Sequence, residues 1–347
     1  MSKMLEEIRE QPEALERTLR LGLKPAARLA REIALKRPKL IILAARGTSD
    51  NAAQLGRYLL EIATGIPVSL AAPSLYTLYH AKIDLKNALI VAISQSGEST
   101  DTNLVLECGR EQGALTVGIT NEPASTLAKL AEHVFLVRAR RERSVAATKT
   151  YTGQVMLLYL LAHALGAKIR LDDLRRVPDW AACALKLEEE ITARAERYRF
   201  MERAVVVGRG LNYANAFEFA LKMMETCYVV AERFSTADFL HGPIAMVERS
   251  FPMFLFAPSG VTWEGMRDMI GRLAALNAET LIFTDRSNRE AVESHARAVV
   301  IPAKLSREWY TPIPYIIPAQ IFAASLAAWK GIDPDQPRTL SKVTRTL

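Results

Sequence analysis

A cluster of hydroxyl side chains follows a strongly apolar run in the first half of the chain. Residues 92–100 read AISQSGEST. Four of these nine residues carry a hydroxyl group: Ser94, Ser96, Ser99 and Thr100. Gly97 lets the backbone turn tightly, and the helix expected to follow supplies unpaired amides and the positive end of its dipole. The combination predicts a turn that binds a phosphate monoester, and an ordinary helix cap is the alternative.

A second group of chemically capable residues lies on an expected helix in the second half. Glu218, Lys222 and Glu225 stand at i, i+4 and i+7, on one helical face. Their surroundings in NAFEFALKMMETCYVVAE are apolar, so the helix should be mostly buried. Buried charges need partners or a function, and a neighbouring carboxylate and ammonium group shift each other's pKa as acid–base sites require. A surface stripe of ion pairs is the alternative.

One histidine and one lysine complete the candidate chemistry. His241 precedes a Gly-Pro pair, so it is expected in a turn, where an imidazole can titrate near neutral pH. Lys342 lies in the tail DPDQPRTLSKVTRTL, where two prolines preclude a regular helix. From its position alone, Lys342 would be a solvated amine.

Short apolar runs alternate with helical stretches in the part of the chain that must position these groups. Strands are expected in KLIILAA, PVSLAA, ALIVAIS, LTVGIT and HVFLVRA. This alternation predicts βαβ units and a parallel sheet, and apolar strands of this kind predict burial on both faces. Ligands of such sheets bind beyond the carboxyl ends of the strands. RGTSD (46–50) and SQSGES (94–99) lie at such strand ends.

The second half of the chain repeats the first at a nearly constant offset. IILAARG ends at Gly47 and AVVVGRG at Gly210, an offset of 163, and the blocks ending at Gly97 and Gly260 keep the same offset. The repeat predicts two tandem, doubly wound, flavodoxin-like parallel sheets, each in three αβα layers. The matching turn APSGVT lacks the hydroxyl cluster. The hydroxyl groups of the first half are therefore not required for folding.

The expected organisation has five parts. N-terminal helices occupy 1–35, and the first sheet domain, with the phosphate turn, occupies 36–170. A helical connector that follows Pro178 lies within 171–200. The second sheet domain, with the charged helix and the histidine turn, occupies 201–330, and residues 331–347 form the tail.

Composition excludes several classes of protein. The chain of 347 residues carries a net charge of +7, but its basic residues are dispersed. The densest cluster, RARRERS (138–144), is short and contains Glu142, so we expect a solvated loop and no nucleic-acid partner. The three cysteines form no CxxC pair, which argues against a disulfide framework or a zinc site and indicates a reducing cytoplasm.

Membrane and nucleotide functions are also disfavoured. The N-terminus is charged and has no apolar signal core. The nearest candidate for a membrane span, 150–169, is interrupted by Gln154 and His163, so we expect a buried helix. No GxGxxG follows either first strand and no GxxxxGK[ST] occurs, which disfavours a dinucleotide or triphosphate site. No metal or organic cofactor is expected.

The chain resembles the sugar isomerase (SIS) domain family, in particular the isomerase half of glutamine–fructose-6-phosphate transaminases. The resemblance is carried jointly by the motifs GTS, SQSGES, VAATK, ALKMMET, LHGP and DQPR. The resemblance implies that the sugar phosphate is bound by Ser49, Ser94, Gln95, Ser96 and Ser99. The family usually has Thr at the position of Ser99. It also implies weaker substrate contacts from Gly47, Thr48, Val145 and Ala146.

The resemblance further implies the catalytic roles. Glu225 is similar to the base that moves a proton between C1 and C2, with Lys222 and Glu218 as its charged neighbours. His241 is similar to a histidine that assists ring opening and reaches in from the second subunit of a dimer. Lys342 is similar to a lysine that forms a Schiff base with the keto sugar.

Two departures from the transaminases set the expected activity. This chain begins at the isomerase half, with no glutaminase to supply ammonia, and Leu240 replaces a lysine. We therefore expect an isomerising deaminase that converts glucosamine 6-phosphate to fructose 6-phosphate and ammonia. The alternatives are a fructosamine-6-phosphate deglycase and a plain aldose–ketose isomerase. A non-catalytic sugar-phosphate sensor is disfavoured because all five catalytic candidates are retained.

Overall fold

The computed structural model of the protein describes residues 2–295, 297–340 and 342. The chain divides into two compact units, each assembled from several segments. Unit 1 is drawn from Met1–Pro12, Arg143–Thr148 and Arg176–Thr339. Unit 2 is drawn from Glu13–Glu142, Lys149–Arg175 and Leu340–Leu347.

Unit 2 contains a parallel sheet of five strands in the order β2-β1-β3-β4-β5. The strands are β1 (Leu40–Ala44), β2 (Val68–Leu70), β3 (Ala88–Ile93), β4 (Leu115–Thr120) and β5 (His133–Leu136). Each lies within one of the five apolar runs in which a strand was predicted. All six residues of β3 and of β4 are buried, as expected for strands covered on both faces.

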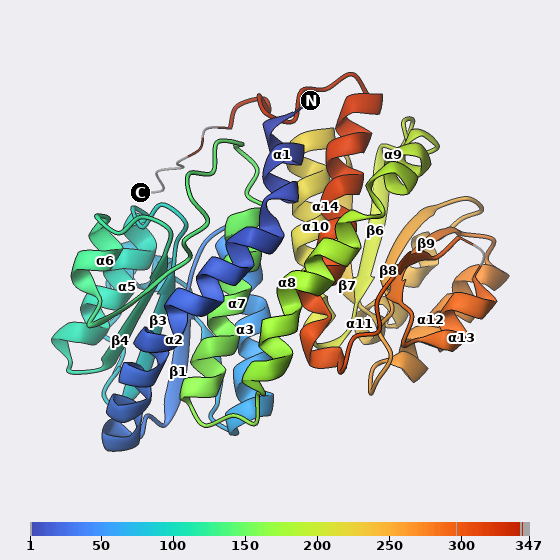
Figure 1. Cartoon of the computed structure of the whole chain (residues 1–347). Coiled ribbons are helices and arrows are strands. Elements are labelled where there is room, and N and C mark those ends of the chain that lie inside the picture. The colour runs from blue at the N-terminus through green and yellow to red at the C-terminus, as the bar shows by residue number, and fades with distance from the viewer. Residues whose placement is uncertain (1, 296, 341, 343–347) are drawn as a thin grey trace. The chain divides into compact units, whose positions relative to one another are not determined.

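Helices cover both faces of this sheet (Figure 1). They are α2 (Gln11–Lys36), α3 (Thr48–Thr64), α4 (Ser74–Thr77), α5 (Thr100–Glu111), α6 (Thr126–Leu130) and α7 (Lys149–Ala164). The helices α3 and α7 pack against each other, and α5 packs against α4 and α6. Apolar residues of β1 and β3 form a core with Val105 and Leu106 of α5. The two-faced packing fixes where the strand ends and their turns lie.

Unit 1 repeats the same architecture. Its five parallel strands have the order β10-β9-β8-β6-β7, which corresponds to that of unit 2 when read in reverse. The strands are β6 (Arg203–Gly208), β7 (Val230–Ser235), β8 (Pro252–Phe256), β9 (Glu279–Asp285) and β10 (Val299–Ile301). The prediction of two flavodoxin-like sheets is thus confirmed, because 2-1-3-4-5 is that topology.

The helices of unit 1 include two that carry the chemistry discussed below. They are α1 (Lys3–Arg9), most of α8 (Leu171–Leu185), α9 (Glu188–Glu196), α10 (Tyr213–Cys227), α11 (Thr236–Leu240), α12 (Trp263–Ala275), α13 (Arg289–Ser294) and α14 (Pro312–Trp329), with three short 3-10 turns, η1 (Gly210–Asn212), η2 (Pro243–Met246) and η3 (Glu308–Tyr310). The helix α10 packs against α14 and β7.

Two expectations about helices were wrong. The connector helix α8 begins at Leu171, ahead of Pro178, because a buried apolar face that includes Leu174 and Trp180 outweighs the one backbone hydrogen bond that the proline removes. The helix α7 is buried, as predicted, but α14 is a stronger membrane candidate that the sequence analysis overlooked. It is long and apolar enough to cross a bilayer, yet 89% of it is buried inside the protein, as in a core helix.

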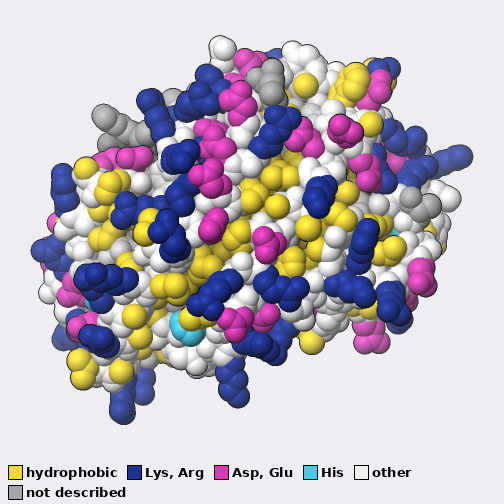
Figure 2. All heavy atoms as spheres, in the orientation of Figure 1, with side chains coloured by type: hydrophobic (Ala, Val, Ile, Leu, Met, Phe, Trp, Pro, Cys, Tyr) yellow, Lys and Arg dark blue, Asp and Glu magenta, His cyan; other side chains and the backbone are white. Residues whose placement is uncertain are grey.

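The charged side chains are dispersed on the face shown in Figure 2, where Lys and Arg alternate with Asp and Glu. Within unit 2, exposed Arg140 and half-buried Arg17 both pair with Glu13. This interspersion agrees with the dispersed basic residues of the sequence.

Candidate active-site residues

The hydroxyl-rich turn lies at the point in unit 2 where the strand order reverses. The strands β1 and β3 are parallel neighbours, with Ala44 paired to Ala92. Their carboxyl ends therefore meet at the same edge of the sheet. Gly47, Thr48 and Ser49 follow β1, and the segment 94–99 follows β3. This is the location at which doubly wound sheets bind their ligands.

Glycine is required in the turn after β3. Gly97 has a φ of 68°, and a Cβ atom there would lie 2.2 Å from the Ser125 hydroxyl oxygen. Its backbone amide donates to the Ser94 hydroxyl at 3.1 Å, and the Glu98 amide donates to Ser96 at 3.3 Å. The Asn103 amide group donates to the Gly97 carbonyl at 3.1 Å. The turn is therefore preorganised around its serine side chains.

Capping of α5 does not explain the hydroxyl of Ser99. Ser99 is the N-cap residue of α5, but its side chain accepts no capping hydrogen bond and instead lies 3.0 Å from the Thr102 hydroxyl. Ser96 and Ser99 are half-buried, as is Gln95. The first-turn amides of α5 and these hydroxyl groups are donors of the type that bind a phosphate.

The turn after β1 adds a buried serine and a charged pair. The Gln154 amide of α7 donates to the hydroxyl of buried Ser49 at 2.9 Å, so α7 fixes the position of this hydroxyl. The Arg46 guanidinium group forms an ion pair with buried Asp101 at 2.7 Å. Burial raises the pKa of Asp50, and the Arg46 charge opposes that rise.

The charged stripe of α10 in unit 1 is buried rather than exposed. The ammonium group of Lys222 lies 3.5 Å from the Glu218 carboxylate, and both side chains are completely buried. Lys222 also forms a short ion pair with Glu225, whose side chain is 23% exposed. The stripe thus runs from a buried carboxylate through a buried ammonium group to a carboxylate that solvent reaches. Only Glu225 of the three is placed to exchange a proton with a bound molecule.

His241 lies outside this stripe. It is the C-cap residue of α11, and its backbone amide donates to the Asp238 carbonyl at 3.2 Å. The residue is exposed, just before Gly242 at a φ of 142°. An exposed imidazole in a turn is accessible to a ligand or to another chain.

Lys342 has a partner that the sequence analysis did not identify. Its ammonium group lies 3.1 Å from the carboxylate of Glu142, which is completely buried. The same carboxylate accepts hydrogen bonds from the Thr150 amide at 3.1 Å and the Thr150 hydroxyl at 2.6 Å. Lys342 is therefore held against the start of α7 within unit 2. The only signal in the sequence was an acid inside a basic run, just before VAATK.

Removing this carboxylate charge should release Lys342. In Glu142→Gln the ion pair is lost, while the amide oxygen can still accept from Thr150. A partly buried ion pair contributes about 1 kcal/mol, so acetylation of Lys342 by acetic anhydride should rise about fivefold. Peptide mass spectrometry measures the acetylation, with Lys330, which donates to the Met201 carbonyl, as an internal reference. Unchanged acetylation of Lys342 would show that the contact does not restrain the tail.

The loop that contains Val145 and Ala146 belongs to unit 1. Buried Glu7 of α1 accepts hydrogen bonds from the backbone amides of Arg143 and Ser144. Ala146 is buried and Val145 is half-buried. The N-terminal helix thus fixes the conformation of this loop.

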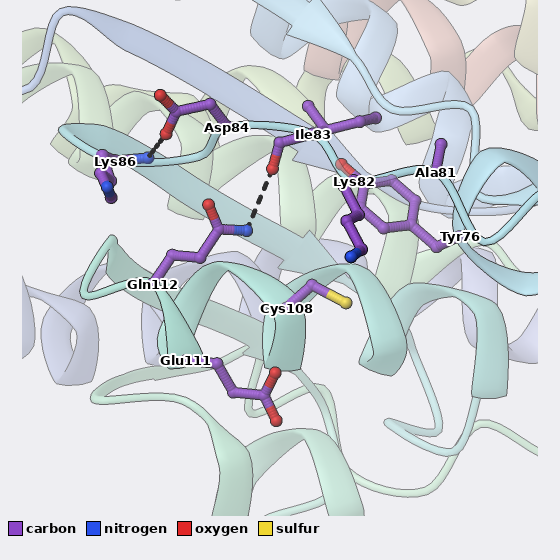
Figure 3. A pocket seen from close by; sticks show the side chains of 9 residues that line it. All are labelled: Tyr76, Ala81, Lys82, Ile83, Asp84, Lys86, Cys108, Glu111 and Gln112. Atoms are coloured by element: carbon purple, nitrogen blue, oxygen red, sulfur yellow. Dashed lines mark hydrogen bonds between the residues drawn. The ribbon is translucent and has the colours of Figure 1, made fainter.

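A pocket of about 450 Å³ in unit 2 contains none of the predicted site residues. Its lining side chains are drawn in Figure 3 and include Tyr76, Cys108 and Gln112. The Gln112 side chain donates to the Ile83 carbonyl at 3.0 Å. Burial raises the pKa of the Cys108 thiol, so that the thiol is a poor nucleophile. The lining also includes charged side chains such as Lys82, Asp84 and Glu111, but none of the residues predicted to carry the chemistry.

Two copies of one domain type account for both sheets. Residues 34–164 and 199–329 each match the SIS domain, and the chain belongs to the SIS domain family. The glutamine–fructose-6-phosphate aminotransferase (isomerizing) of Pyrococcus horikoshii is 34% identical over 346 residues. The match covers 98% of this chain but only 57% of that relative's length.

Two solved structures share the whole fold. The C-terminal domain of glucosamine–fructose-6-phosphate aminotransferase from Francisella tularensis is 28% identical, with a TM-score of 0.87 over 97% of this chain and 98% of that one. A candidate phosphosugar isomerase from Silicibacter pomeroyi is 31% identical, with a TM-score of 0.86 over 96% of this chain and 100% of that one. This chain thus shares its two-domain SIS fold with proteins named as a sugar-phosphate aminotransferase and a phosphosugar isomerase.

Proposed function

We propose that this protein is a phosphosugar isomerase that acts on glucosamine 6-phosphate and releases fructose 6-phosphate and ammonia. The observation that carries the proposal is the α10 stripe, in which a solvent-accessible carboxylate, Glu225, is paired with a fully buried ammonium group. Structural helices rarely bury such charges without a function. The serine-rich turn supplies the donors for the phosphate.

In the proposed reaction His241 opens the sugar ring. Glu225 removes the C2 proton of the open-chain aldehyde and returns it to C1, while a proton leaves the amine nitrogen and another is added to O1. The C1 aldehyde and C2 amine thereby become a C1 alcohol and a C2 imine. Lys222 is buried and acts through Glu225: its ammonium group holds the Glu225 carboxylate in place for this transfer. Water then adds to the imine carbon, and ammonia leaves. No redox step occurs.

Two observations favour an amino sugar over a neutral one. The relatives are named as fructose-6-phosphate aminotransferases. Lys342, held by Glu142, provides an amine that can form an imine with a keto sugar. A plain isomerase needs only Glu225 and His241. A deglycase would use the same groups on a substrate with a larger amine substituent.

Ammonia release from purified protein and glucosamine 6-phosphate tests the proposal directly. A panel with glucose 6-phosphate and a fructosamine 6-phosphate separates the three activities. We expect ammonia and fructose 6-phosphate in equal amounts from the amino sugar. A folded protein that binds the amino sugar phosphate but releases no ammonia would contradict the deaminase, and interconversion of neutral sugar phosphates alone would favour the plain isomerase.

Ser96→Ala should raise KM about tenfold and leave kcat nearly unchanged. The hydroxyl of Ser96 is proposed to donate to the phosphate, and losing one hydrogen bond to a charged group costs about 1.5 kcal/mol of binding. Steady-state kinetics measure both constants. The matched control is Ser259→Ala at the corresponding turn of unit 1, which should change neither. A fall in kcat at constant KM would show that the turn does not bind the phosphate.

We also propose that the protein is a cytoplasmic homodimer in which His241 completes the partner's active site. Its exposure at a turn is compatible with that role. Mixing Glu225→Gln and His241→Asn chains tests it. If each site combines residues of two subunits, mixed dimers regain activity in one of their two sites. If they regain none, His241 acts within its own chain.

A further inference from the structure

The turn of unit 1 that corresponds to the hydroxyl-rich turn is occupied by a carboxylate of the chain itself. The correspondence follows the constant offset: Gly47 and Gly210 both have a φ of 56°, and the helices after the second turn begin at Thr100 and Trp263. In unit 1 the side chain of Glu308 reaches into the space between the two turns.

The Glu308 carboxylate contacts both turns. The Thr262 hydroxyl donates to Oε1 at 2.8 Å, and the Thr262 amide, at the start of α12, lies 3.4 Å from Oε2. A Cβ atom on Gly260 would lie 2.5 Å from Oε2, and one on Gly210 would lie 3.6 Å from Oε1. The carboxylate thus sits against two glycine turns and a helix N-terminus, an arrangement that suits an anion.

Glu308 is buried, with 9% of its surface exposed. Burial raises its pKa, and hydrogen bonds from Thr262 and the Val261 backbone oppose the rise. Burying the Glu308 carboxylate costs desolvation free energy, which a glutamate at the surface would not lose. The corresponding glycines of unit 2 face no carboxylate: a Cβ atom on Gly47 would meet no atom of the described residues within 4 Å, and one on Gly97 would meet the neutral Ser125 hydroxyl.

We infer that unit 1 keeps an anion-binding turn equivalent to the phosphate turn of unit 2, and that Glu308 is its permanent internal ligand. The chain therefore offers one phosphate site instead of two, and substrate binds in one orientation. Removing the carboxylate opens the second site to a tetrahedral oxyanion. The inference rests on the proposed function only for the identity of the first site.

Titration of inorganic phosphate into the full chain, followed by calorimetry, tests this. Wild type should bind one phosphate per chain, Glu308→Ala two, and Ser96→Ala/Glu308→Ala should retain the new site with the first one weakened. Glu308→Gln fills the same space and should gain no site. Adding Thr262→Val to Glu308→Ala should weaken the gained site about tenfold, because valine removes the hydroxyl donor and keeps the backbone amide.

The outcomes separate the two proposals. If wild type binds no phosphate but Glu308→Ala binds one, the phosphate turn of unit 2 is misassigned and the inference about Glu308 stands. If wild type binds one and Glu308→Ala gains none, the inference is overturned. A Glu308→Ala chain that folds only in phosphate buffer supports it. A chain that stays unfolded in tens of millimolar phosphate contradicts it, because the anion should replace the lost carboxylate.

Discussion

Replacing Glu225 by Gln is expected to lower kcat at least a thousandfold while leaving sugar-phosphate affinity close to that of wild type. The carboxamide has nearly the same shape and can still accept a hydrogen bond from Lys222, but it cannot take a proton from carbon. A positioned general base contributes about 10² to 10⁴-fold to a rate. Glu225 is partly exposed, at the accessible end of the stripe, so this substitution should not unfold the protein.

Two measurements make this test specific. Steady-state ammonia release gives kcat. NMR in D₂O follows deuterium at C2 of the recovered amino sugar and at C1 of fructose 6-phosphate, which reports the proton transfer by itself. Both should fall together in Glu225→Gln. The control is Glu264→Gln, an exposed glutamate on α12 of the same unit, which should leave both unchanged. If deuterium exchange persists at the wild-type rate, another residue is the base.

The strands were predictable because they are short, apolar and buried on both faces. The five first-half runs each contain one strand, and the offset of 163 matched the blocks that contain β6 and β8 of unit 1 to those of β1 and β3. The offset also matched Gly47 to Gly210, and the structure gives both the same φ. These strands can be recognised locally because every strand buried on both faces of a parallel sheet requires a short run of apolar residues.

The partners of the site residues were not predictable in the same way. Glu142 and Lys342 are separated by 200 positions, and Glu308 and Thr262 by 46. No local periodicity encodes such contacts, because they depend on how the loops after β5 and β10 fold back. The spacing of Glu218, Lys222 and Glu225 predicted one face of a helix, whereas the complete burial of Glu218 and Lys222 became clear only from the packing of α10 on α14.

Substituting Lys222 by Met is expected to destabilise the protein by about 3 kcal/mol. The change removes the ammonium group that lies 3.5 Å from the fully buried Glu218 carboxylate. Breaking a buried ion pair by deleting one partner typically costs about 3 to 5 kcal/mol, because the remaining charge stays desolvated. Urea unfolding followed by circular dichroism measures the free energy of unfolding. Lys304→Met, at an exposed position of unit 1, should change it by less than about 0.5 kcal/mol.

A second substitution separates the charge effect from the loss of packing. Glu218→Gln in the Lys222→Met background removes the stranded charge and should restore about 2 kcal/mol of the loss, although the double variant stays inactive. Such a recovery without activity would mean that the pair is kept for chemistry, since a neutral pair folds nearly as well. If Lys222→Met alone unfolds at the wild-type urea concentration, solvent reaches the stripe and the buried-pair description of α10 fails.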